Sequence, residues 1–127
     1  QGTGPGEFAL LHNIWVDKDS RVIICDREND RIQIFEDDGT FVEEWTDISK
    51  PGDVWVHENL VYCVEQGEHG GVSIWTLSGE VVSRWKIDDE PGRGTIIGGH
   101  GITVDSEGSI YVTEIGTGER VSKFVRV

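Results

Sequence analysis

The fold is decided by residues 14–45, which read IWVDKDSRVIICDRENDRIQIFEDDGTFVEEW. This stretch holds four short runs that are rich in Val, Ile and aromatic residues, at 14–17, 22–26, 31–35 and 41–45. Runs of four or five residues are too short for helices, and their β-branched and aromatic side chains favour strands. The stretch therefore predicts four consecutive short β-strands.

The same pattern occurs twice more. The second copy has runs at 54–57, 60–65, 72–75 and 81–85, and the third has runs at 102–105, 109–114 and 121–124. Equivalent residues lie 40 positions apart from Trp15 to Trp55 and 48 positions apart from Trp55 to Thr103. A period of about 40–50 residues with four short strands in each repeat is typical of β-propeller blades.

Glycines separate the strands inside the repeats. Gly39, Gly79 and Gly108 each end a short segment between two runs, where a tight hairpin needs a residue with positive φ. No amphipathic helix of useful length interrupts the pattern. We therefore predict an all-β chain of three four-stranded blades, which is half of a six-bladed β-propeller.

The charge of the chain excludes some classes of partner. The 127 residues include 11 basic and 24 acidic residues, for a net charge of −13, and no segment carries a cluster of Lys and Arg. Binding to nucleic acid or to an anionic membrane is therefore not expected. No apolar stretch is long enough to span a membrane, so the sequence predicts a soluble protein but does not indicate its compartment.

The cysteines and tryptophans follow the pattern of core residues. Cys25 and Cys63 both lie inside apolar runs, so we expect buried free thiols and no disulfide. The five tryptophans recur at blade positions, as packing residues do: Trp15, Trp45, Trp55, Trp75 and Trp85.

The ends of the repeats indicate which blades these are. The expected blades cover residues 9–46, 51–86 and 99–127, and the third stops after its third strand, so it lacks the outer strand. Residues 1–8 have the Gly-rich character of a connection that follows an earlier blade. These features predict a partial propeller, the C-terminal half of a longer one. Its two free blade faces predict self-association, with two chains forming a six-bladed ring.

The sequence resembles the NHL repeat. The resemblance is carried by GPGEF at 4–8, LHNIWVD at 11–17 and CDRENDRIQIF at 25–35. More narrowly, the chain is similar to bacterial relatives of peptidyl-α-hydroxyglycine α-amidating lyase. GHGITVD at 99–105 and KFVRV at 123–127 resemble the last blade of those proteins. The resemblance covers nearly the whole chain and implies a lyase-like propeller.

The resemblance also implies a metal site. Amidating lyases hold a metal in the central channel with histidines at the starts of innermost strands, and His12 and His100 match two of these positions. Each lies two residues before the Ile that opens a predicted strand, so both should face the channel at one level. Neutral imidazoles that converge on an axis suit Zn²⁺. The second blade has Lys50-Pro51-Gly52 at the equivalent place and offers no ligand.

Arg27 matches the active-site arginine of the family, which would hold the substrate carboxyl or stabilise developing charge. The implied reaction cleaves a hydroxyglycine-extended peptide to an amide and glyoxylate, with metal and base deprotonating the hydroxyl. The third histidine and the catalytic tyrosine would lie in the other half, since neither Tyr62 nor Tyr111 matches the tyrosine. We therefore expect the chain alone to be inactive.

Other interpretations stay open. His12 and His100 are also compatible with metal-free channel residues, and Arg27 with an ion pair to Glu28, Asp26 or an acid of a neighbouring blade. A non-catalytic propeller that binds a protein, a peptide or a small ligand in its channel has the same fold. Asp26, Glu65 and Glu114 recur at one register, which favours a role in capping turns within each blade. His57 and His69 are expected at the surface, and the long segment 86–99 is expected to form a loop beside a binding surface.

Overall fold

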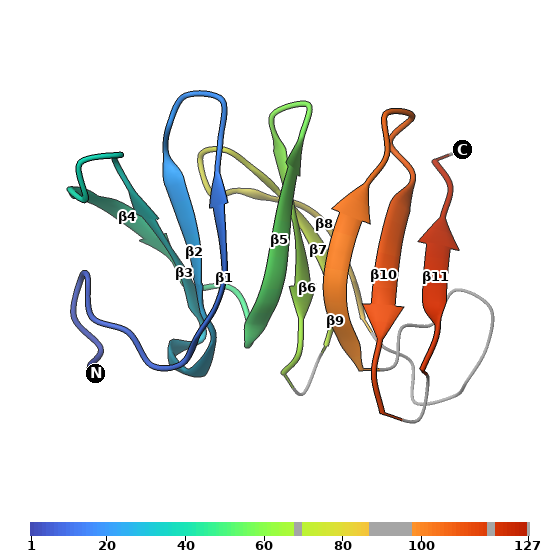
Figure 1. The fold of residues 1–127 in the computed structure, drawn as a ribbon, viewed down its shortest axis with the longest axis horizontal. Helices are drawn as coiled ribbons and strands as arrows, with labels where there is room; N and C mark the ends of the chain where they lie inside the picture. Colours follow the sequence, from blue (N-terminus) through green and yellow to red (C-terminus); the bar gives the residue numbers. More distant parts are fainter. Residues whose placement is uncertain (68–69, 87–97, 117–118, 127) are drawn as a thin grey trace.

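A computed structural model describes residues 1–67, 70–86, 98–116 and 119–126. Within them, three small antiparallel sheets lie side by side, in chain order (Figure 1). His69 and most of the loop predicted at 86–99 lie outside the described residues. In the part of the chain that is described, no helix has the length and apolar character that crossing a membrane requires.

Each sheet is a meander whose strands pair in chain order, and we number the sheets as blades 1 to 3. Blade 1 contains β1 (Leu11–Val16), β2 (Val22–Asp26), β3 (Arg31–Phe35) and β4 (Phe41–Trp45), with the short 3₁₀ helix η1 (Arg27–Asn29) after β2. Blade 2 contains β5 (Pro51–His57), β6 (Leu60–Glu65), β7 (Gly71–Thr76) and β8 (Val81–Lys86). Blade 3 contains β9 (Gly99–Val104), β10 (Ile110–Glu114) and β11 (Val121–Phe124). The prediction of three propeller-type blades, the last without its outer strand among the described residues, is confirmed.

The innermost strands begin three residues earlier than predicted, at Leu11, Pro51 and Gly99. Each first residue pairs with the acid that ends the second strand of its blade: Leu11 with Asp26, Pro51 with Glu65 and Gly99 with Glu114. A register shift follows each of these pairs, so an extra residue bulges out of the inner strand. Glycine, proline and polar residues at these positions hide the strand from an apolar pattern.

Tight turns join the strands as the glycines predict. Gly39, Gly79 and Gly108 have φ of 87°, 81° and 81°. The amide of each donates to the carbonyl three residues earlier, that of Glu36, Thr76 or Asp105. L side chains rarely adopt this φ, so glycine allows the tight turn. The turn then keeps the paired strands in register.

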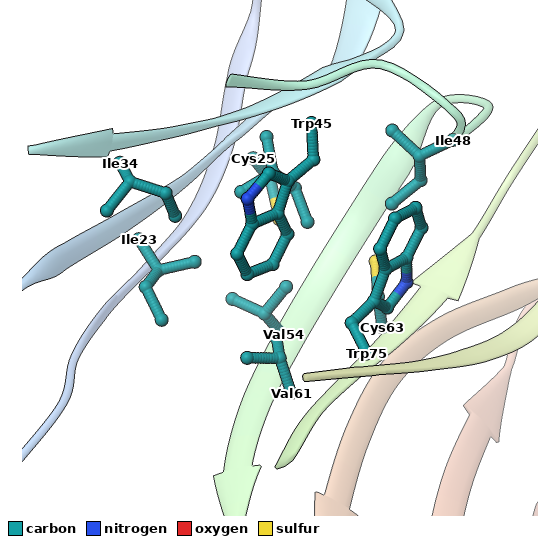
Figure 2. Packing of buried hydrophobic residues seen from close by; sticks show 10 residues of the cluster. Ile23, Cys25, Ile34, Trp45, Ile48, Val54, Val61, Cys63 and Trp75 are labelled. Carbon is teal, nitrogen blue, oxygen red and sulfur yellow. The ribbon is translucent and has the colours of Figure 1, made fainter. Parts of the chain in front are cut away.

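The core lies between the blades. Between blades 1 and 2, Trp45 stacks on Trp75 with ring centroids 5.7 Å apart and planes 10° apart. Cys25 and Cys63 are fully buried free thiols beside them (Figure 2), as predicted. Burial raises the pKa of the Cys63 thiol well above its ordinary value, so it stays protonated. A second cluster between blades 2 and 3 contains Tyr62, Val64, Val72, Ile102, Val104, Ile110 and Val112.

A buried acid ends the second strand of every blade. Asp26 Oδ1 accepts from the Ala9 amide at 2.8 Å, and Glu65 Oε2 accepts from the Ser49 amide at 2.9 Å, so both fix the segment that enters their own blade. Each acid also pairs with an arginine of its blade, Arg31 for Asp26, Arg84 for Glu65 and Arg120 for Glu114. Asp26 and Glu65 therefore fix the segments that lead into their blades, and all three acids pair with an arginine of their own blade.

The N-terminal residues lie against the side of blade 1 that faces away from blade 2 (Figure 1). The Arg31 guanidinium donates to the carbonyls of Thr3, Gly4 and Glu7, and Gln33 donates to Glu7 and accepts from the Gly6 amide. Asp26 also holds the segment that enters blade 1, through the Ala9 amide. Glu65 holds the connection between blades 1 and 2 in the same way, through the Ser49 amide.

Candidate functional site

The two candidate histidines lie at equivalent irregularities of β1 and β9. His12 lies within the bulge between Leu11 and Ile14, and His100 is the extra residue between Gly99 and Gly101. A bulge turns the side chain of its extra residue away from the alternation of the strand. Both imidazoles are half-buried, and their ring centroids are 5.1 Å apart with planes at 71°. The histidines from blades 1 and 3 therefore meet at one place.

Blade 2 has glycine at the equivalent position. Gly52 is the extra residue in the bulge of β5, between Pro51 and Asp53, so it stands where the other blades have a histidine. A Cβ at this position would lie 2.6 Å from Nε2 of Gln66, a contact that real side chains do not make. Gln66 uses this space to reach blade 3, where Nε2 lies 3.3 Å from the Gly99 carbonyl.

The Gly52 carbonyl also orients one imidazole. His12 Nδ1 lies 2.5 Å from Gly52 O. Because a carbonyl oxygen only accepts, Nδ1 carries the proton in this contact, and the lone pair of the neutral ring is on Nε2. Metal-binding histidines in proteins are commonly held in this way.

The pocket beside the histidines has a volume of about 320 Å³, and Arg27 also lines it. Arg27 is the first residue of η1, and its Nε is buried without a hydrogen-bond partner among the residues that the structure describes. Its ion pair to Glu28 is 3.6 Å long, whereas the Lys50 ammonium lies 2.7 Å from the other Glu28 oxygen and holds the pKa of Glu28 below its ordinary value. The structure thus brings the three predicted site residues, His12, His100 and Arg27, to one pocket.

Asp53 lies next to this site and was not predicted. Its Oδ2 accepts from the Ile102 amide of β9 at 2.8 Å, and its Oδ1 accepts from the Val54 amide at 2.9 Å. Burial raises the pKa of Asp53 above its ordinary value, while the hydrogen bonds and the charges of His12 and His100 act in the opposite direction. The sequence signal for Asp53 is its register, because it follows the bulge residue as Asn13 and Gly101 do.

The arrangement combines two imidazoles with a loosely paired guanidinium, which are groups that bind a divalent metal and a carboxylate. Within residues 1–67, 70–86, 98–116 and 119–126, no group of three or more His, Cys, Asp or Glu side chains is arranged to hold a metal ion. The described residues therefore offer two histidine ligands, and metal binding stays a prediction.

No protein-family model matches the chain. NHL repeat-containing protein 3 of Homo sapiens is 30% identical over 137 aligned positions, which cover 98% of the chain and 38% of that protein. Protein lin-41 of Caenorhabditis elegans is 46% identical over 44 residues, 35% of the chain and 4% of that protein. The three sheets are NHL-type propeller blades.

Solved structures share the fold of these NHL blades. A catalytically inactive His→Ala variant of virginiamycin B lyase from Staphylococcus aureus with quinupristin matches at a TM-score of 0.65 with 16% identity. The match covers 91% of the chain and 41% of that lyase. A streptogramin B lyase matches at a TM-score of 0.63 with 13% identity, over 91% and 40% of the two chains. The chain thus spans less than half the length of these relatives.

Proposed function

We propose that the chain is part of a metal-dependent propeller lyase of the peptidyl-α-hydroxyglycine amidating type, in which His12 and His100 are two of the metal ligands. The observation that carries the proposal is the 5.1 Å separation of the two imidazole rings in the pocket that Arg27 also lines. Two bulges in different blades converge there, and the blade between them has glycine at the equivalent position.

The two imidazole side chains are of the kind that binds a zinc ion. The contact to the Gly52 carbonyl leaves the Nε2 lone pair of His12 available, and both rings are half-buried and line a pocket of about 320 Å³. When bound, zinc supplies Lewis-acid polarisation of a substrate oxygen. The remaining ligands and the base would come from residues outside this chain or from a second copy of it.

Arg27 would bind the carboxylate of the substrate. Arg27 lines the pocket, and its planar guanidinium can donate two parallel hydrogen bonds to a carboxylate. Two structural neighbours support a lyase in general terms, since both are lyases of this fold and one of them is catalytically inactive when a histidine is replaced by alanine.

Zinc binding tests the proposal. We expect purified chain to bind zinc, and His12→Ala and His100→Ala each to weaken binding by at least about 10–100-fold, the loss that follows even from removing an outer partner of a metal ligand. Competition with a chromophoric chelator measures the affinity. The matched control is His57→Ala, since His57 ends β5 beside the β5–β6 turn and does not line the pocket.

The opposite result has a clear form. If the chain binds no zinc at micromolar concentration while circular dichroism shows it folded, or if His57→Ala weakens binding as much as His12→Ala, the metal proposal is wrong. A non-catalytic scaffold is then the better proposal, and the lack of three assembled ligands among the described residues favours it. The scaffold predicts peptide or partner binding that a chelator does not change.

We also propose that the chain self-associates, through the free face of blade 1. The inner half of this face contains Ile14 and Val16, which are 60% and 57% exposed, with Val22 and Ile24 directly opposite them on β2. A chain with a net charge of −13 needs an interface that does not bring acidic groups together, and these four side chains carry no charge. The occupant that fits is the same apolar face of a second copy, packed around a two-fold axis.

The free face of blade 3 is chemically different. By register, Thr103 stands where blades 1 and 2 have Trp15 and Trp55, and Lys123 stands at the position of Ile74 in blade 2. The Lys123 ammonium lies 3.7 Å from Asp105 Oδ2 and 4.9 Å from the Tyr111 ring centre, and Tyr111 donates to the same carboxylate. A head-to-tail ring of two copies would press this charged network against Ile14 and Val16.

Two charge substitutions distinguish the arrangements. We expect Ile14→Lys to shift the chain from dimer to monomer in light scattering, because it buries an unpaired charge in a face-to-face contact. Val121→Lys, on the free face of blade 3 and 66% exposed, should leave the dimer intact. Loss of the dimer in both variants would indicate the head-to-tail ring, and a monomeric parent chain at working concentration would refute self-association.

A further inference from the structure

Blade 2 contributes no histidine to the candidate site, yet its inner strand contacts both neighbouring blades at that point. The Gly52 carbonyl lies 2.5 Å from His12 Nδ1 of blade 1. One residue later, Asp53 Oδ2 accepts the Ile102 amide of blade 3 at 2.8 Å. Consecutive residues of β5 therefore bind the strand that carries each histidine.

The contact with blade 3 depends on close approach. Ile102 follows His100 by two residues, and Gly101 lies between them. A Cβ at Gly101 would lie 3.5 Å from Asp53 Oδ2 and 2.8 Å from Thr113 Oγ1, so a side chain there would force the Thr113 hydroxyl to move. This hydroxyl accepts from the Gly101 amide at 2.9 Å. The segment around His100 is thus fixed from both sides, by Asp53 of blade 2 and by Thr113 of its own blade.

The Asp53 carboxylate is also without a cationic partner of the usual kind. No Lys or Arg lies within ion-pair distance of it among the described residues. The ionisable groups that act on it are His12 and His100. A carboxylate in this position favours a bound cation in the pocket.

We infer that the dipeptide Gly52-Asp53 positions the histidine pair: the Gly52 carbonyl holds His12 through Nδ1, and the Asp53 carboxylate holds the β9 segment that carries His100. Asp53 is therefore a positioning residue, because its two carboxylate oxygens accept the backbone amides of Ile102 and Val54. The use of this arrangement for metal rests on the proposed function above. The positioning of the two rings does not rest on the proposed function.

The test compares Asp53→Ala with Asp53→Asn, which keeps an oxygen acceptor for the Ile102 amide. In the metal-free protein, we expect Asp53→Ala to speed hydrogen exchange of the Ile102 amide by about 10–100-fold relative to neighbouring β9 amides, the loss expected for a hydrogen bond to a charged group. Asp53→Asn should recover most of this protection. The nuclear Overhauser contact between the His12 and His100 rings should weaken in Asp53→Ala and persist in Asp53→Asn.

Zinc affinity is the second measurement, by chelator competition. We expect Asp53→Ala to weaken zinc binding by about 10–100-fold, as removal of an outer partner does. The matched control is Asp19→Ala, because Asp19 is an exposed acid in the β1–β2 turn, where it pairs with Lys18. Asp19→Ala should change neither Ile102 exchange nor zinc affinity.

The two proposals fail in different ways. A parent chain that binds no zinc overturns the proposed function, while Ile102 exchange and the ring contact still decide the positioning. If both of these are unchanged in Asp53→Ala, the positioning inference is overturned, even in a chain that binds zinc. If Asp53→Ala speeds exchange throughout β9 equally, its effect is global destabilisation, and the inference is overturned as well.

Discussion

Trp75→Ala is expected to destabilise the chain by about 3–5 kcal/mol, the usual cost of truncating a buried tryptophan. Trp75 is 1% exposed and stacks on Trp45 of the neighbouring blade (Figure 2). The Arg84 guanidinium lies 5.5 Å from its ring centre, and its Nε1 donates to Ser73 Oγ at 2.7 Å. Truncation therefore opens a cavity between blades 1 and 2 and leaves Ser73 without this partner.

Equilibrium unfolding in urea, followed by far-ultraviolet circular dichroism, measures this effect. Trp75→Phe is the matched variant, because Phe124 occupies the same register in blade 3 and packs on Trp85 at 5.9 Å. We expect Trp75→Phe to lose much less stability than Trp75→Ala. Equal midpoints for Trp75→Ala and the parent chain would mean that the packing between blades 1 and 2 is not what holds them together.

Asp26→Ala is expected to cost about 3 kcal/mol or more, because removing one partner of a buried ion pair leaves the other charge uncompensated. Asp26 is fully buried, and Oδ2 lies 2.7 Å from Nε of Arg31, which is itself buried. The same oxygen also accepts from Asn29 at 2.9 Å. Glu44 still contacts Arg31 in this variant, but from a more exposed position, so it compensates only in part.

The pH dependence of stability checks the same residue. Burial alone would raise the pKa of Asp26, but hydrogen bonds from Ala9, Asn29 and Arg31 outweigh it and hold the pKa below the ordinary value of 3.8. A carboxyl with a lowered pKa in the folded state contributes stability above its unfolded pKa and loses it as pH falls through the folded pKa. The difference in unfolding free energy between the parent and Asp26→Ala should therefore shrink below about pH 4.

Asp38→Ala is the control for this series. The pKa of Asp38 is also lowered, by its hydrogen bonds with Thr40, but Asp38 lies exposed in the β3–β4 turn. We expect a change within about 0.5 kcal/mol for this surface position. A loss at Asp38 as large as at Asp26 would contradict the view that burial of the ion pair sets the effect.

The regular parts of the blades could be predicted from the sequence because apolar runs and turn glycines report local geometry directly. Gly39, Gly79 and Gly108 have the positive φ that their hairpins require. The first three residues of β1, β5 and β9 could not be predicted in this way. They pair through their backbones with the residue that ends the next strand, across a bulge, and such pairing needs no apolar side chain.

The candidate site also has residues that could be predicted from the sequence and one that could not. His12, His100 and Arg27 were predicted from the resemblance to the amidating lyases, and the structure brings them to one pocket. Asp53 escaped notice because blade 1 has Asn13 and blade 3 has Gly101 at its position, so no repeated carboxylate marks it. Its importance comes from its contact with blade 3. The sequence pattern within a single blade does not predict contacts between blades.

In this molecule the bulges of the inner strands carry the histidines of the candidate site, and they are not part of the apolar core. The extra residue of each bulge does not follow the alternation of side chains along its strand. The residues before and after it therefore keep their places in the core. Histidine, glycine and histidine occupy this position in three successive blades that otherwise pack alike. The side chain at the bulge can therefore vary in blades 1 and 3, whereas any side chain in place of Gly52 would first have to displace Gln66.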